Sequence, residues 1–135
     1  MSKHINEAIS RVNALLIAVF LLGASSGVIA DTFQYGQHVE PAYEGWRPNS
    51  DGTFSFMFGY MNENWEESPD MPVGDNNFIS PGDADQGQPT HFLPRRNRFI
   101  FEVTVPSDWG ERELVWTLNI NGVERKAYGL SLIHI

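Results

Sequence analysis

The sequence predicts an all-β protein, an antiparallel β-sandwich of the immunoglobulin or fibronectin type preceded by an N-terminal signal helix. Three segments alternate apolar and polar residues at period two, which is the pattern of half-buried strands. The dipeptide Asn121-Gly122 follows the last of these segments and predicts a tight type I′ hairpin turn. After residue 30 no segment repeats apolar residues at the helical period of 3.6, so the expected fold is built from sheets.

Residues 1–30 have the composition of a secretory signal peptide. Basic residues precede an unbroken apolar run over 14–22, which is shorter than the roughly 20 residues that a membrane-spanning helix needs. Val28 and Ala30 provide the small side chains that signal peptidase requires, so we expect cleavage between Ala30 and Asp31. The mature chain is then secreted or periplasmic and has no membrane anchor.

Charge and cysteine content limit the partners of the mature chain. The whole sequence carries a net charge of −8; residues 1–30 contribute +1, so the remainder carries −9. An acidic surface repels nucleic acid and anionic lipid, so neither is expected as a partner. The chain has no cysteine, so its fold must depend on core packing, a bound ion or a neighbouring subunit.

Residues 31–129 are expected to form a single domain. Residues 31–48 form an irregular entry segment rich in turn residues and aromatics. Residues 53–60 are the clearest strand, and alternation predicts an inner face made of Phe54, Phe56, Phe58 and Tyr60.

Residues 61–94 form a long loop region that is rich in proline, glycine and acidic residues. A loop of this length is uncommon in a compact domain and is usually functional or disordered. Its aromatic and apolar residues argue against disorder. We therefore expect short strands at 71–73 and 77–79 that hold the region to the sheet.

Two further strands and a hairpin return complete the expected fold. Residues 98–105 should place one set of side chains on the inner face, namely Phe99, Phe101, Val103 and Val105. Residues 114–120 alternate again and place Trp116 in the core, and residues 123–128 return after the turn. The last six residues, 130–135, resemble the translation of a sequencing adapter, so no function is assigned to them.

Several strings resemble an uncharacterised family of exported bacterial proteins. They are Tyr43-Glu-Gly-Trp46, Asn49-x-Asp51-Gly-Thr-Phe54, Phe58-Gly-Tyr-Met-Asn62, Pro72-Val-Gly74, Gly87-Gln-Pro-Thr-x-Phe92, Pro94-Arg-Arg96 and Trp116-Thr-Leu118. The resemblance covers most of residues 41–129. It implies a secreted β domain and indicates no activity.

Aromatic residues outside the clear strands are the first candidates for a binding site. A flat stacking surface for sugars could be built from Tyr43, Trp46, Trp65 and Trp109. The polar contacts would then come from Asn62, Asn64, Asp70 and Gln88. The alternative is that these aromatic rings pack in the core or fix loops, because aromatic side chains bury a large area in small domains.

Arg95, Arg96 and Arg98 form the only basic cluster in this acidic sequence. We expect these side chains to pair with carboxylates of residues 63–85 and to anchor that loop, because arginine suits bidentate contacts with carboxylates. The alternative is capture of an anionic ligand or of an acidic surface on a partner.

Asp75, Asp83 and Asp85 are candidate calcium ligands, because calcium prefers oxygen donors. The spacing does not match an EF-hand loop, and aspartate and glycine are also ordinary turn residues. The expectation is therefore no cofactor, with calcium kept as an alternative.

The sequence contains no recognisable catalytic motif and no cysteine nucleophile, so we expect a protein that is not an enzyme. The leading hypothesis is an exported, non-catalytic β-sandwich module that acts by binding or assembly. The first alternative is a carbohydrate-binding module that uses loop aromatics. The second is a structural subunit of a surface assembly, whose partner is another protein subunit.

Overall fold

The computed structural model describes residues 33–131, which form six β-strands. They are β1 (Val39–Pro48), β2 (Phe54–Asn62), β3 (Asn77–Ser80), β4 (Arg95–Val105), β5 (Leu114–Ile120) and β6 (Val123–Gly129). No helix occurs within this described range. All six strands belong to one compact unit, Gln34–Ile135. The predicted signal peptide and most of the predicted adapter-derived end lie outside the described residues.

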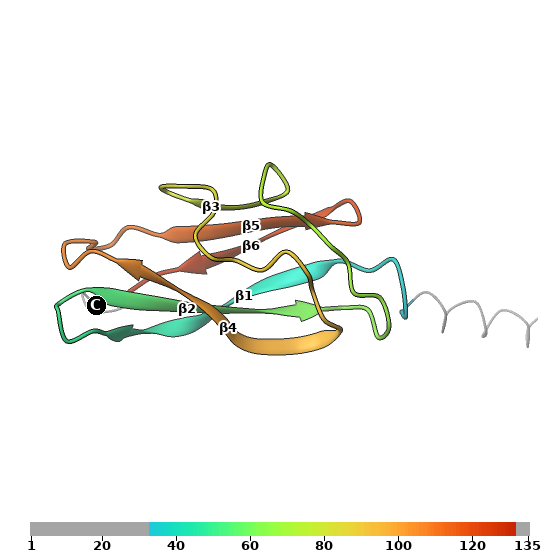
Figure 1. Cartoon of the computed structure of the whole chain (residues 1–135), viewed down its shortest axis with the longest axis horizontal. Coiled ribbons are helices and arrows are strands. Elements are labelled where there is room, and N and C mark those ends of the chain that lie inside the picture. Colours follow the sequence, from blue (N-terminus) through green and yellow to red (C-terminus); the bar gives the residue numbers. More distant parts are fainter. Residues whose placement is uncertain (1–32, 132–135) are drawn as a thin grey trace, which may run out of the picture. The chain divides into compact units, whose positions relative to one another are not determined.

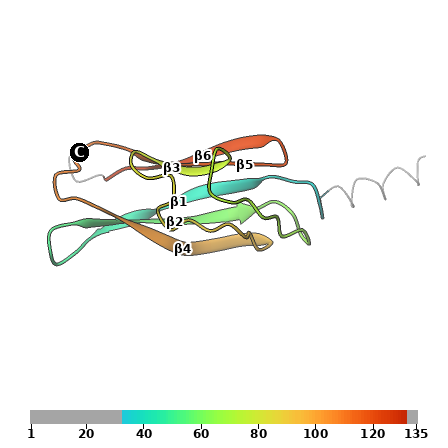
Figure 2. The ribbon, with the colours of Figure 1, turned by 45° about the horizontal axis from the view of Figure 1, so that its top comes forward.

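The strands form two antiparallel sheets that lie as two layers (Figures 1 and 2). One sheet has the order β1-β2-β4, and the other has the order β3-β5-β6. Every pair of neighbouring strands is antiparallel. The prediction of an all-β fold made of antiparallel sheets is confirmed.

Both sheets contribute apolar side chains to a common core. Phe56 and Phe58 of β2 are fully buried, as is Trp116 of β5. The rings of Phe58 and Trp116 meet edge to face with centroids 6.2 Å apart. Phe101 of β4 packs edge-on against the same indole at 5.0 Å. Such pairs contribute about 0.5–1.5 kcal/mol beyond the burial of their area. The predicted core position of Trp116 is confirmed.

The turn between β5 and β6 has the geometry that its Asn-Gly sequence predicts. The φ angles of Asn121 and Gly122 are 55° and 79°. A type I′ turn requires positive φ at both positions, which glycine and asparagine adopt more readily than other residues. The side-chain amide of Asn121 also donates a hydrogen bond of 2.7 Å to the carbonyl of Gln37, so this turn is tied to the segment before β1.

The prediction of an irregular segment at 31–48 is wrong for β1. This strand contains Pro41 and Pro48, which cannot donate hydrogen bonds to a ladder. It also shifts register between Tyr43 and Gly45, where Gly45 has a φ of 130°. The sheet tolerates these features because β1 is an edge strand. They also break the alternation that would have identified the strand in the sequence.

The predicted inward position of Phe99 on β4 is also wrong. Phe58 pairs with Phe101 while Tyr60 pairs with Asn97, so residues 98–100 bulge opposite Gly59 alone. Phe99 has a φ of 51°, and its side chain is 59% exposed. A left-handed φ in a bulky residue costs about 1–3 kcal/mol, so surrounding contacts must hold the bulge in place.

Gly59 provides the space for this bulge. A Cβ atom at this position would clash with the backbone carbonyl oxygen of Asn97 and with the carboxylate of Glu44. The side-chain amide of Asn97 donates to the carbonyls of Leu93 and Arg95, each at 3.1 Å. The path of β4 is therefore set partly by a residue on β2 and partly by its own preceding turn.

The loop region 61–94 contains one of its two predicted short strands. Residues 77–80 form β3. Residues 71–73 form no strand, and only the isolated bridges Asp70–His91 and Gly74–Asn77 lie beside them. The expectation of a strand at 77–79 is confirmed, and that of a strand at 71–73 is wrong.

Asn77 ties this loop region to the core. Its buried side-chain amide donates to the carbonyls of Met71 and Pro89, both at 2.9 Å. Its side-chain oxygen accepts a hydrogen bond of 2.9 Å from the indole nitrogen of Trp116. The side chain of Asn77 thus accepts the hydrogen bond of the Trp116 indole nitrogen and also joins the segments around residues 71 and 89.

Candidate functional site at the Trp65 end

Four segments meet at one end of the two sheets, which we call the Trp65 end: residues 34–38, 62–67, 93–95 and 121–122 (Figure 1). The opposite end, which we call the Trp109 end, contains residues 49–53 and 106–113. Both ends carry a tryptophan that the sequence marks as a candidate ligand contact.

Two buried asparagines shape the loop at 62–67. The amide of Asn62 donates to the carbonyl of Glu67 at 2.8 Å and to that of Phe92 at 3.2 Å. The side-chain oxygen of Asn62 accepts from the backbone and the side-chain amide of Asn64, at 3.0 and 2.9 Å. Buried amides satisfied in this way fix the loop backbone, because breaking one leaves polar groups unpaired.

Residues 34–38 dock on this loop through a dense set of hydrogen bonds. Gln37 and Asn64 exchange two of them, at 2.7 and 2.9 Å. The backbone amides of Glu66 and Glu67 both donate to the carbonyl of Gln34 at 3.1 Å. The Tyr35 hydroxyl donates to the Glu66 carboxylate. The loop is therefore held from the core side and from its outer side.

Trp65 lies on this fixed loop and is 60% exposed. The guanidinium of Arg95 stacks over its ring, with Cζ 4.1 Å from the ring centroid, in a cation–π contact. Arg95 also donates to the carbonyl of Glu63 at 3.0 Å, and its own φ is 64°. The result is an exposed indole on an ordered backbone, with a cation and the Glu66 carboxylate nearby in the fold.

The other predicted ligand aromatics pack against the protein. Trp109 is buried, and its ring packs in the core instead of facing solvent. Trp46 is half-buried and meets Phe54 edge to face at 5.8 Å. Tyr43 is half-buried, and its hydroxyl donates to the carbonyl of Leu130 at 3.0 Å. Burial raises the pKa of Tyr43 to about 12, so this donor stays protonated at neutral pH.

The predicted polar contacts are used inside the fold. Asn62, Asn64 and Gln88 are buried, and their amides bond to backbone carbonyls of the loops. Asp70 is exposed and its carboxylate accepts from His91 at 2.8 Å. These four residues were candidate polar contacts for a ligand. In the structure, Asn62, Asn64 and Gln88 hold the loops through hydrogen bonds to backbone carbonyls.

The three arginines have three different positions. Arg95 contacts residues 63 and 65, as described above. Arg96 bonds to the Glu44 carboxylate of β1 and to the carbonyl of Tyr60, so it does not anchor residues 63–85 as expected. Arg98 lies exposed in the bulge of β4.

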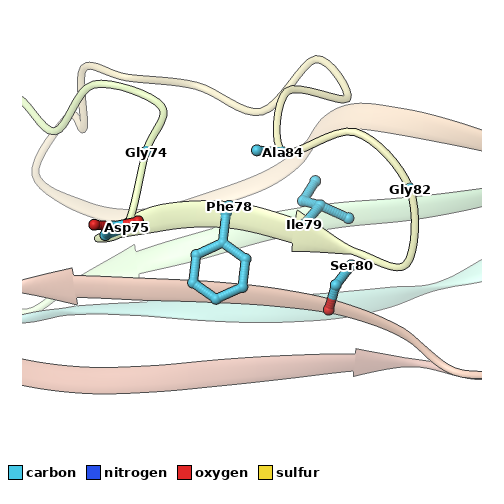
Figure 3. A pocket seen from close by; sticks show the side chains of 7 residues that line it. All are labelled: Gly74, Asp75, Phe78, Ile79, Ser80, Gly82 and Ala84. Carbon is cyan, nitrogen blue, oxygen red and sulfur yellow. The ribbon is translucent and has the colours of Figure 1, made fainter.

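The acidic candidates for calcium binding are exposed and lie around β3. Asp75 borders an open depression of about 310 Å³ that Figure 3 shows, with Phe78 between Asp75 and Ser80. The lining residues are Gly74, Asp75, Phe78, Ile79, Ser80, Gly82 and Ala84. Asp83 and Asp85 are not among them. Over residues 33–131, no three His, Asp or Glu side chains gather closely enough to share a metal ion.

Phe99 and Ile100 are both exposed on the bulge of β4, and alternation in the sequence placed only Ile100 on the face opposite to the core. The alternation of residues along β4 places Phe99 on the inner face. Its outward position results from the bulge opposite Gly59, which lies on another strand. Leu93, which precedes β4, is exposed as well.

No protein-family model, curated protein or solved structure matches this chain. In the part of the chain that the structure describes, no helix is long and apolar enough to cross a membrane.

Proposed function

We propose that this chain is an exported, non-catalytic β-sandwich module that binds its partner through the Trp65 end. The observation that carries the proposal is the exposure of Trp65 on a loop whose backbone is fixed by buried Asn62 and Asn64. An aromatic side chain kept in solvent on an ordered loop is available for binding without a large ordering cost.

The strand order supports the immunoglobulin-like or fibronectin-like type of sandwich. In immunoglobulin constant domains one sheet has the order A, B, E and D, and the other has C, F and G. The sheets β1-β2-β4 and β3-β5-β6 follow these orders without a counterpart of strand D. The core tryptophan differs in place, because Trp116 lies on the fifth strand, which corresponds to F, whereas antibody domains carry theirs on C.

The ligand class that best suits the Trp65 end is carbohydrate. The face of an indole can stack against the apolar face of a sugar ring. The Arg95 guanidinium and the Glu66 carboxylate supply donor and acceptor groups for hydroxyls.

A glycan array probed with the exported protein tests this function. Wild-type protein should bind at least one glycan, and Trp65→Ala should abolish that binding. Tyr128→Ala is the matched control, because Tyr128 is a similarly exposed aromatic on β6. The proposal fails if no glycan binds or if Trp65→Ala binds as wild type does.

Export itself rests on residues 1–30 and is tested separately by sequencing the N-terminus of the secreted protein. The expected first residue is Asp31. An intact Met1 on protein recovered outside the cytoplasm would contradict cleavage at that position.

A second candidate function is that of a structural subunit in a surface assembly. It is favoured by the exposed Phe99 and Ile100 on the outermost strand of a sheet. Apolar side chains on an edge strand are a common means of strand-to-strand association.

A further inference from the structure

β4 presents two adjacent apolar side chains to solvent on an open sheet edge. Phe99 is 59% exposed and Ile100 is 43% exposed. β4 is the last strand of its sheet and pairs with β2 alone. Among residues 33–131, no backbone hydrogen bond joins the outer edge of β4 to another segment. An edge of this kind can accept a further chain.

The outer edge of β3, in the other sheet, is hydrogen-bonded to neighbouring loops. The amide of Ile79 donates to the carbonyl of Ala84 at 3.1 Å. Asn77 and Gly74 exchange two backbone hydrogen bonds, at 3.1 and 3.0 Å. The chain therefore covers the edge of β3 with its own loops and leaves that of β4 open.

The sequence at the open edge is complementary to itself. Arg98-Phe99-Ile100-Phe101-Glu102 is symmetric in character about Ile100, with phenylalanine on both sides and opposite charges at the two ends. In an antiparallel pair of identical strands centred on Ile100, each Arg98 lies opposite the Glu102 of the second copy. Arg98, Ile100 and Glu102 are all exposed in the single chain.

We propose that the bulged half of β4 is a homodimer interface, in which two copies of this chain pair about a two-fold axis through Ile100. The net charge of −8 opposes contact between most faces of two copies. The bulge of β4 is an exception, because it carries the exposed Arg98, whereas the charge of Arg96 beside it is balanced by Glu44. A two-fold contact is closed, so it uses the same patch on both copies and stops at two.

The bulge determines what kind of contact is expected. The left-handed φ of Phe99 interrupts a regular backbone ladder, so side chains at 98, 100 and 102 should provide most of the contact. It also prevents β4 from acting as a flat template for continued strand addition. This interface is centred on residues 98–102, whereas the glycan site uses Trp65 and Arg95 at the start of β4, so each can be tested without altering the other.

Sedimentation equilibrium of the exported protein over a range of concentrations tests the proposal. Wild type should show a monomer–dimer equilibrium, and Ile100→Glu should remain monomeric. Arg98→Glu and Glu102→Arg should each weaken the dimer by about tenfold, because each places like charges opposite one another. The double variant Arg98→Glu/Glu102→Arg should recover dimerisation close to wild type.

Two controls keep this result specific. Glu102→Arg also removes the ion pair of Glu102 with Arg47, so the melting temperature of each variant is measured in parallel. Lys126→Glu reverses an exposed charge on β6 and should leave dimerisation unchanged. A wild-type protein that stays monomeric at every soluble concentration overturns the proposal, as does a double variant that stays as weak as its single parents.

Discussion

Trp65 and Trp109 stand at opposite ends of the same pair of sheets, and each carries a stacked arginine, yet one is exposed and the other buried. The Arg95 guanidinium lies 4.1 Å from the Trp65 ring, and that of Arg112 lies 4.4 Å from the Trp109 ring. Trp65 is 60% exposed and Trp109 only 8%.

The difference arises from what lies beneath each ring. Trp109 packs edge to face against Phe56 at 6.4 Å, and its indole nitrogen donates to the carbonyl of Arg112 at 2.7 Å. The loop beneath Trp65 is instead filled by Asn62 and Asn64, whose amides satisfy backbone groups. A stacked arginine is therefore found beside both an exposed and a buried tryptophan. The residues under each loop determine whether its tryptophan is buried in the core or exposed at the surface.

The largest test of this comparison is Trp109→Ala. Removing a buried aromatic side chain should destabilise the fold by about 3–5 kcal/mol. Trp65→Ala should cost about 1 kcal/mol or less, because it removes an exposed ring and one cation–π contact. Urea unfolding followed by circular dichroism measures both. Equal destabilisation by the two substitutions would show that Trp65 is also part of the core.

Asn62→Ala should have an intermediate effect that is confined to the Trp65 end. The substitution leaves the carbonyls of Glu67 and Phe92 without their side-chain donor, which should cost about 1–3 kcal/mol. Amide hydrogen exchange should accelerate over 63–67 and stay unchanged over 106–113. If exchange rises equally at both ends, the asparagine supports the whole fold and not one loop.

The smallest effect concerns Asp51, in the turn at the Trp109 end. Its carboxylate accepts hydrogen bonds from the Thr53 hydroxyl at 2.6 Å and from the Thr53 amide at 3.0 Å. The hydroxyl contact, followed by the amide contact, lowers the pKa of Asp51 below its ordinary value of 3.8. The stabilisation is therefore fully present above that ordinary value and is lost as the pH falls through the lower pKa of the folded state.

Melting temperatures of wild type and Asp51→Ala, compared from neutral to acidic pH, measure this effect. The small difference between the two proteins should disappear at the acidic end. A difference that persists after the carboxylate is protonated would assign it to the turn geometry and not to the charge.

The strands that sequence analysis identified are those whose alternation is set locally. Phe56 and Phe58 on β2 and Trp116 on β5 follow period two without interruption, and Asn121-Gly122 specifies its turn alone. β1 was not predicted as a strand, because an edge strand tolerates proline and a register shift, and both disturb the alternation of apolar and polar residues.

The candidate site was less predictable because burial of a loop residue depends on distant segments. Trp65 and Trp109 both lie in loops in the sequence, and the contact of Trp109 with Phe56 of β2 cannot be read from its own loop. Asn62 and Asn64 were candidate ligand contacts under the carbohydrate hypothesis, whereas in the structure their side-chain amides donate to the backbone carbonyls of residues 37, 67 and 92. Phe99 faces outward because Gly59, on a neighbouring strand, admits the bulge.

Gly59 decides what a different strand shows to solvent. Any side chain at this position would meet the backbone of β4, so the path of that strand depends on the absence of a Cβ atom on β2. With a larger residue there, β4 would have to straighten or move away from β2. The exposed apolar edge is therefore encoded in part outside the strand that carries it.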